Sequence, residues 1–181
     1  MQVRLDKRAR IIADGGQAYP VDLLRDHTLV QVRQKYTDDT GELTLAPGEE
    51  TTDEVTVGGR VVFARNTGKL CIASLQDGFT ETSNGERLQI MLSKAEVGDE
   101  SLAAWKSDVD LGDHVWVRGR VVVSRRGELS IMAAEWRMAS KALRPLPTLH
   151  KELSEESRVR RRYADLVVRE ESRQMVRTRA V

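Results

Sequence analysis

A carboxylate and an amide stand in segments whose residue pattern is typical of β-strands. Glu128 lies in residues 127–131, Gly-Glu-Leu-Ser-Ile, and Gln89 lies in residues 88–90, Leu-Gln-Ile. A carboxylate can accept a hydrogen bond from N3–H of uridine, and an amide can pair with base edges, so both suit recognition of unstacked RNA bases. Because Gly-Glu before alternating apolar residues is also typical of an ordinary hairpin, this interpretation depends on the surrounding elements.

Strand alternation brings these side chains to a common face. If the more apolar residues of each strand point inward, then Ile72, Gln89 and Glu128 share the outer face. Arg65, at the end of the first strand pattern, is near enough in sequence to reach that face. Each residue alone is typical of a solvated strand, but their convergence favours a binding surface.

Positive charge near this face would bind phosphate groups. The candidates for phosphate contact are Arg60, Lys69, Arg118, Arg125 and Arg126. Each of them alone is typical of any protein surface. A further basic run, residues 158–163, is consistent with a phosphate-binding stripe or a localisation signal. It is equally consistent with a helix that packs on another domain through neighbouring acids.

The sequence contains no recognisable catalytic or metal-binding pattern. None of the three histidines has a Cys or His partner at ligand spacing, so we predict no metal site. Gly68-Lys69 is followed by Leu70 rather than Ser or Thr, which excludes a nucleotide-binding P-loop. Cys71 is expected to be a small core residue, and no carboxylate pair stands in apolar surroundings that would suit acid–base work.

The order of the predicted elements is that of a small β-barrel. Strand patterns occur at residues 55–63, 70–76 and 88–92, a helical pattern at 101–109, and strand patterns at 115–123 and 129–138. We therefore predict a mainly β fold: a five-stranded OB-fold barrel, which binds oligonucleotides on one face, with a helix between strands three and four. An SH3-like barrel is the alternative. Within the first strand, the alternation groups Phe63 with the valines at 55, 57 and 61.

The chain divides into four regions around this barrel. They are an N-terminal helical extension with an acidic loop (1–54), the OB-fold domain (55–140), a linker (141–153) and a C-terminal helical segment (154–181). In the first region we expect helices at 3–14 and 28–36 and the acidic loop at 37–54. Pro145 and Pro147 are expected to stiffen the linker.

The composition is sufficient for a hydrophobic core, and acidic and basic residues are concentrated in different parts of the chain. A hydrophobic content of 40% is enough for a core, and 29 Lys and Arg nearly balance 28 Asp and Glu. The acidic loop carries seven acids and no Lys or Arg, whereas basic residues outnumber acidic ones from residue 139 onward. One cysteine excludes an internal disulfide framework, and no signal peptide or membrane span is recognised, so we expect a cytoplasmic protein.

Several sequence blocks, spread over nearly the whole chain, are shared with one known family. They are Tyr19-Pro20, Asp26-His27-Thr28, Gly59-Arg60, Gly68-Lys69, Leu75-Gln76-Asp77, Asp110-Leu111-Gly112-Asp113, Gly127-Glu128-Leu129-Ser130, Lys141-Ala142-Leu143-Arg144-Pro145-Leu146-Pro147, Arg162-Tyr163-Ala164-Asp165-Leu166 and Glu171-Ser172-Arg173. The chain resembles the N-terminal part of bacterial class II lysyl-tRNA synthetases, most closely those of actinobacterial type. The blocks at 141–147 and 162–166 are the specific ones, because aspartyl and asparaginyl enzymes share the OB domain but match these two less well.

The resemblance implies that the OB-fold grips the anticodon loop of lysine tRNA. At the matching positions, Arg65, Gln89 and Glu128 would contact anticodon bases, and Ile72 stands at the stacking position. The family usually has phenylalanine there, and base–aromatic stacking contributes about 1–3 kcal/mol per base. We therefore expect weaker tRNA binding than in a relative that carries the ring.

In the family, a separate C-terminal domain activates lysine with ATP and magnesium. Residues 154–181 resemble the start of that domain, so this chain is expected to hold no cofactor and not to charge tRNA alone. Its C-terminal helix is expected to contact a catalytic domain or a synthetase-like dimer partner, and no membrane is expected among its partners. Two alternatives stay open: a general single-stranded nucleic-acid binder, and a structural or interaction paralogue that does not bind RNA.

Overall fold

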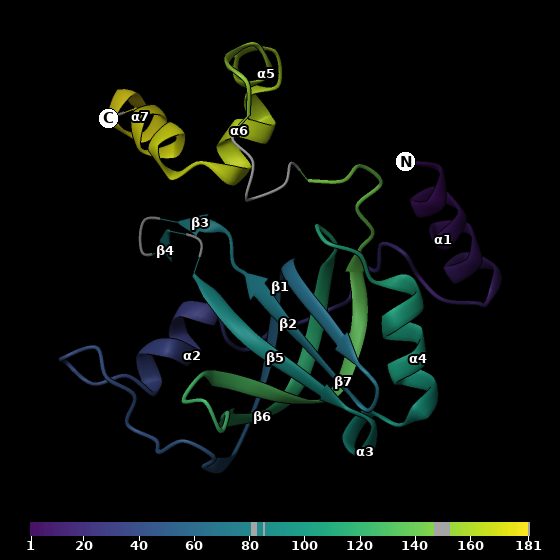
Figure 1. Ribbon diagram of the computed structural model, residues 1–181, viewed down its shortest axis with the longest axis vertical. Helices are drawn as coiled ribbons and strands as arrows, with labels where there is room; N and C mark the ends of the chain where they lie inside the picture. Colours follow the sequence, from purple (N-terminus) through teal and green to yellow (C-terminus); the bar gives the residue numbers. More distant parts are fainter. Residues whose placement is uncertain (81–82, 85, 147–152, 181) are drawn as a thin grey trace. The chain divides into compact units, whose positions relative to one another are not determined.

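The chain consists of two compact units. The structure is a computed structural model, and it describes residues 1–80, 83–84, 86–146 and 153–180 (Figure 1). The first unit spans Met1–Arg144 and contains the barrel, and the second spans Pro145–Val181 and is helical. Of the predicted linker, residues 147–152 lie outside the described part.

Five strands of the first unit close into a barrel (Figure 1). They are β1 (Glu50–Thr67), β2 (Leu70–Gln76), β5 (Arg87–Ser93), β6 (His114–Val123) and β7 (Leu129–Ser140). Around the barrel the order is β1-β2-β5-β7-β6, and every neighbouring pair is antiparallel except β5 and β7. A short pair, β3 (Phe79–Thr80) and β4 (Ser83–Asn84), lies between β2 and β5 in the chain. The OB-fold predicted from the sequence is confirmed.

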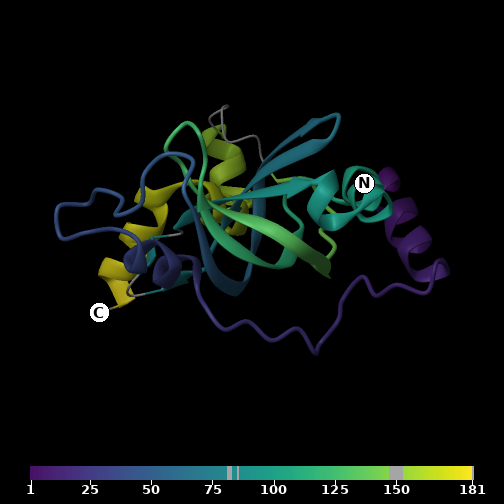
Figure 2. The same ribbon diagram turned by 90° about the horizontal axis from the view of Figure 1, so that it is seen from below.

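Helices cover the barrel on two sides and complete its core. As predicted, helical structure separates the third and fourth barrel strands: α3 (Lys94–Val97) and α4 (Asp99–Asp108). Trp105 of α4 is 1% exposed and meets Trp136 edge to face, with ring centroids 5.1 Å apart. The helix α2 (Leu29–Lys35) begins with a capping box at Thr28 and buries Leu29 and Val32 in the same core. Figures 1 and 2 show α2 and α4 on opposite sides of the barrel.

An extended segment joins the first helix, α1 (Gln2–Ala13), to α2 and runs past the barrel (Figure 2). Two aromatic side chains help to fasten this segment. The indole N–H of Trp116 donates to the carbonyl of Leu24 at 2.8 Å, and the Tyr19 hydroxyl donates to the carbonyl of Lys141 at 3.0 Å. The segment therefore ties the N-terminal extension to β6 and to the end of β7.

Strand β1 departs from its predicted alternation at one position. Val61 pairs with Leu75 and Phe63 pairs with Ser74, so Val62 is the extra residue of a β-bulge. Val62 is consequently 8% exposed, whereas Phe63 is 52% exposed. The predicted grouping of Phe63 with the inward-facing valines is therefore wrong, because the bulge shifts the alternation by one residue. β1 also starts at Glu50, so the last residues of the acidic segment are strand rather than loop.

A buried ion cluster fixes the point where the chain leaves the barrel. The ammonium of Lys141 lies 2.6 Å from a carboxylate oxygen of Asp110 and 2.6 Å from one of Asp113, and the Lys141 and Asp113 side chains are fully buried. Lys7 of α1 pairs with Asp110 at 2.7 Å. Burial alone would raise the pKa of the Asp110 carboxyl, but hydrogen bonds from Lys141 and Lys7 outweigh it, so the pKa lies below its ordinary value. The cluster thus connects α1, the loop before β6 and the end of β7.

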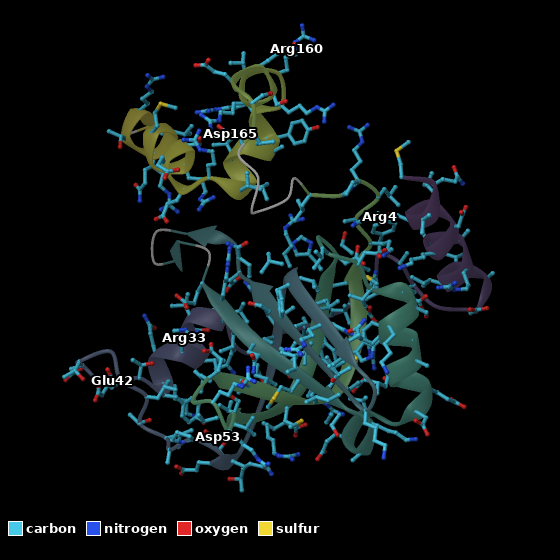
Figure 3. All side chains as sticks on the ribbon, in the orientation of Figure 1. Arg4, Arg33, Glu42, Asp53, Arg160 and Asp165 are labelled. Atoms are coloured by element: carbon cyan, nitrogen blue, oxygen red, sulfur yellow. The ribbon has the colours of Figure 1, made fainter. Side chains whose placement is uncertain are left out.

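In the described part of the second unit there are three helices, where the sequence predicts one helical stretch. They are α5 (Glu155–Arg160), α6 (Arg162–Val168) and α7 (Glu170–Ala180). The buried carboxylate of Asp165, labelled in Figure 3, accepts hydrogen bonds from Arg162 and Ser172, each at 2.6 Å, and joins α6 to α7. The basic run at 158–163 is divided between α5 and α6. No helix in the described part of the chain has the length and apolar character needed to cross a membrane.

Candidate nucleic-acid interface

The outer face of the barrel is hollowed into a groove of about 870 Å³. Strands β2 and β5 form much of its floor, and the loop between β6 and β7 forms one border. The predicted site residues that line it are Arg65, Ile72, Gln89, Arg125, Arg126 and Glu128. Side chains from four separate stretches of the sequence therefore meet in one concave surface.

An apolar stripe crosses the floor of this groove. In the strand register, Ile72 pairs with Met91, and Met91 pairs with Met132 on β7. Arg65 stands at the β1 end of this row, opposite Ile72. The row gives a base an apolar surface with a cation at one end, but it carries no aromatic ring. The two methionines were not named as site residues from the sequence, although strand alternation places Met91 on the face of Gln89 and Met132 on the face of Glu128.

A hydrogen-bond chain orients the amide of Gln89. Its Nε2 donates to the hydroxyl of Ser130 at 2.9 Å, and that hydroxyl donates to the backbone carbonyl of Glu128 at 2.9 Å. With its nitrogen directed toward Ser130, the carbonyl oxygen of Gln89 can accept from a base edge. The amide is therefore held in position before any ligand arrives.

The carboxylate of Glu128 is presented by a tight turn. Gly127 adopts φ of 82°, which favours glycine, and the hydroxyl of Ser124 accepts from the Glu128 backbone N–H at 3.0 Å. The Glu128 side chain is 55% exposed and belongs to the groove lining. It is accessible to a ligand and, as an ionised acid, acts only as a hydrogen-bond acceptor.

Arg33 of α2 reaches the same turn and was not recognised from the sequence. One of its terminal nitrogens donates to the carbonyl of Arg87 at 2.6 Å and lies 3.9 Å from the Glu128 carboxylate. Its Nε lies 2.6 Å from Glu86. Figure 3 shows Arg33 on α2 beside the barrel. No local sequence signal indicates that Arg33 contacts the Glu128 turn. The predicted helix at 28–36 places Arg33 on one helix face, but it does not indicate which part of the barrel packs against that face.

The remaining phosphate candidates, Arg60, Lys69 and Arg118, are not among the residues that line the groove. Lys69 is in the turn between β1 and β2, beside the groove. Arg118 pairs with Glu135 at 3.0 Å and with Glu54 at 3.6 Å. Arg60 donates to the carbonyl of Gly112 at 3.0 Å, and burial lowers the pKa of its guanidinium. Neither Arg60 nor Arg118 is among the residues that line the groove.

Comparison with known proteins agrees with this fold. Residues 55–139 match a family model described as an OB-fold nucleic acid binding domain. The lysine–tRNA ligase of Kineococcus radiotolerans is 58% identical over 99% of this chain and 34% of its own length. That of Mycolicibacterium gilvum is 55% identical over 98% of this chain and 33% of its own length.

A different kind of relative shares the same region. A lysylphosphatidylglycerol biosynthesis bifunctional protein of Rhodococcus jostii is 36% identical over 99% of this chain and 14% of its own length. The chain spans about a third of the length of the lysine–tRNA ligases that it matches. Residues 55–139 thus match an OB-fold nucleic acid binding domain, and the chain as a whole is similar to the N-terminal region of bacterial lysine–tRNA ligases.

Proposed function

We propose that this chain binds the anticodon loop of lysine tRNA in the groove of its barrel. In this proposal Glu128 accepts N3–H of a uridine, Gln89 pairs with a base edge, and Arg65 holds the nucleotide that rests on Ile72. Arg125 and Arg126 contact phosphates. The observation that carries the proposal is the convergence of these side chains on one groove of an anticodon-type OB-fold.

The charges of the groove support this assignment. An exposed carboxylate between basic side chains favours a ligand that combines a hydrogen-bond donor with negative charge, as a uridine in RNA does. Three arginines line the groove, whereas Arg118, outside it, is engaged by Glu54 and Glu135. The positive charge is therefore available where the phosphates of an anticodon loop would pass.

The chain would act as part of a lysine–tRNA ligase in the cytoplasm. In such a ligase, we assign the activation of lysine with ATP and magnesium to the part that lies outside the match with residues 1–181. The C-terminal helices of this chain would contact that catalytic part or a second subunit. Within the described residues, no group of three or more His, Cys, Asp or Glu side chains is arranged to hold a metal ion. We assign no step with ATP to this chain.

Titration with labelled RNA tests the proposal. The chain is titrated with an anticodon stem–loop carrying UUU, with the same stem–loop carrying a changed middle base, and with oligo(dT). Preference for UUU, lost in Glu128→Gln, supports the proposal. Equal affinity for all three would instead indicate a general single-stranded nucleic-acid binder. Absence of binding would indicate a structural or interaction role.

A further inference from the structure

Phe63 is a large apolar ring that the fold directs outward. It is 52% exposed on β1, directly after the buried residues Val61 and Val62 and at the start of the exposed end of the strand. Its register partner Ser74 alternates with the buried residues Ala73 and Leu75, so Ser74 and Phe63 both lie on the outer face of the barrel. Without the bulge, Val62 would pair with Ser74 and Phe63 with Ala73, so the ring would point to the opposite face of the sheet. The bulge thus places the aromatic ring on the outer face of β1, the face it shares with Ser74.

The ring stands in the same row as the base-reading amide. Across the strands, Phe63 pairs with Ser74, Ser74 pairs with Gln89, and Gln89 bonds to Ser130. The next row, roughly 7 Å further along the strands, carries Arg65 and Ile72. Phe63 is therefore a diagonal neighbour of Ile72 on the same face, within the reach of an aromatic side chain.

Its surroundings favour a nucleobase over a protein side chain as the ligand. Ser74, directly opposite, is too small to cover the ring, and Arg65 on the same strand supplies positive charge beside it. Among the described side chains of the groove lining and its two rows, Phe63 is the one aromatic ring. A half-exposed planar ring on the same strand as a cation is an arrangement on which single-stranded bases stack.

We propose that Phe63 is a base-stacking residue that extends the groove by one position. It would take the loop base next to the one read by Gln89 and Glu128, and so provide the stacking surface that Ile72 cannot offer. This inference rests on the proposed binding of an anticodon loop. The inference adds Phe63 of β1 to the residues that contact the ligand, although the alternation of the sequence groups Phe63 with core valines.

Binding of a labelled anticodon stem–loop to four chains tests the inference: the native chain, Phe63→Ala, Phe63→Tyr and Ile12→Ala. Ile12 is the matched control, because it is 48% exposed on α1 and lies outside the groove. We expect Phe63→Ala to weaken binding about 5- to 100-fold. Phe63→Tyr retains the ring and should bind within about twofold of the native chain, as should Ile12→Ala.

A series of RNAs, each lacking one loop base, then identifies the stacked position. If Phe63 stacks on one base, the loss caused by Phe63→Ala disappears for the single RNA that lacks this base and persists for the others. An equal loss with every RNA, or no loss with the intact stem–loop, overturns the inference; the second result would assign the ring to a protein contact. If the native chain itself fails to bind, the proposed function fails first. Thermal unfolding of each variant confirms that it is folded.

Discussion

At the scale of single residues, the floor of the groove meets a base through aliphatic and thioether groups. Ile72, Met91 and Met132 form one row across three strands. Ile72→Phe would place a ring in that row, where stacking contributes about 1–3 kcal/mol per base. We expect the variant to bind the anticodon stem–loop roughly tenfold more tightly in a fluorescence anisotropy titration.

Ile72→Leu is the control for this change, since it alters side-chain shape without adding a ring. It should bind within about twofold of the native chain. Unchanged affinity of Ile72→Phe, in a chain that unfolds at the native temperature, would show that no base rests on this position.

Arg33 is expected to act through Glu128 rather than on RNA directly. The guanidinium and the carboxylate are 3.9 Å apart, and the Glu128 side chain is 55% exposed, so their attraction is modest. Arg33→Gln should weaken binding of the UUU stem–loop by about two- to fivefold. In a Glu128→Gln background the same change should have no further effect, because the group that Arg33 positions is gone.

A double-mutant cycle of the two positions measures this coupling. Additive losses would mean that Arg33 contacts RNA independently, for example at a phosphate. Arg33→Lys helps to separate these cases: it retains the charge but loses the planar donor geometry that holds the Arg87 carbonyl.

At the scale of elements, the Lys141 cluster determines how stability depends on pH. The pKa of Asp110 is lower in the folded chain than its ordinary value of 3.8. The resulting stabilisation is fully present above that value and is lost as the pH falls through the folded pKa. Asp110→Asn should therefore reduce the free energy of unfolding at pH 7, and the difference from the native chain should shrink below about pH 4.

Urea unfolding of both chains at pH 7, 4 and 3 measures the effect. Carboxylates that do not contact Lys141 or Lys7 keep the same surroundings in the two chains, so the difference between the chains reports on the cluster around Asp110. A difference of the same size at all three values would mean that Asp110 contributes through packing rather than through its charge.

The elements also show which parts of the fold were accessible from the sequence. The helical pattern at 28–36 and the alternation in β2 and β5 are local, so the sequence correctly indicated them. The bulge at Val62 depends on how β1 pairs with β2, which is not a local property, and Phe63 was therefore grouped with the core. The C-terminal stretch has one helical pattern but breaks at Arg161 and Arg169, where the backbone leaves the helical conformation.

In the candidate site, too, local patterns could be predicted from the sequence and contacts between distant segments could not. Alternation within each strand was enough to propose a common face for Ile72, Gln89 and Glu128, and the structure places all three in one groove. The part played by Arg33 depends on the packing of α2 against the barrel. Likewise, the pairing of Arg118 with Glu54 and Glu135 joins three different strands. Such contacts between distant segments have no signature in the sequence of either segment.

At the scale of the whole molecule, the net charge of +1 indicates no general affinity for nucleic acid. Binding should depend instead on the few arginines of the groove. For single strands, each neutralised phosphate contributes about −0.7 to the slope of log affinity against log salt. With Arg125 and Arg126 engaged on phosphates, we expect a slope of about −1.4 for the native chain.

Alanine at Arg125 or Arg126 should each make this slope shallower by about 0.7. Arg118→Ala is the control, since Arg118 is paired with Glu54 and Glu135 outside the groove. A change of slope in Arg118→Ala equal to that in Arg125→Ala would mean that RNA follows a different path over the barrel.

The proposed function depends above all on whether the Glu128 carboxylate accepts N3–H of the middle anticodon uridine. The most direct measurement compares two stem–loops that differ only in an N3-methyl group on this base, each titrated with the native chain and with Glu128→Ala. We expect the methyl group to weaken native binding about tenfold or more, because a charged group loses its hydrogen bond, and to change the affinity of Glu128→Ala little. If both chains respond equally to the methyl group, Glu128 does not read this base.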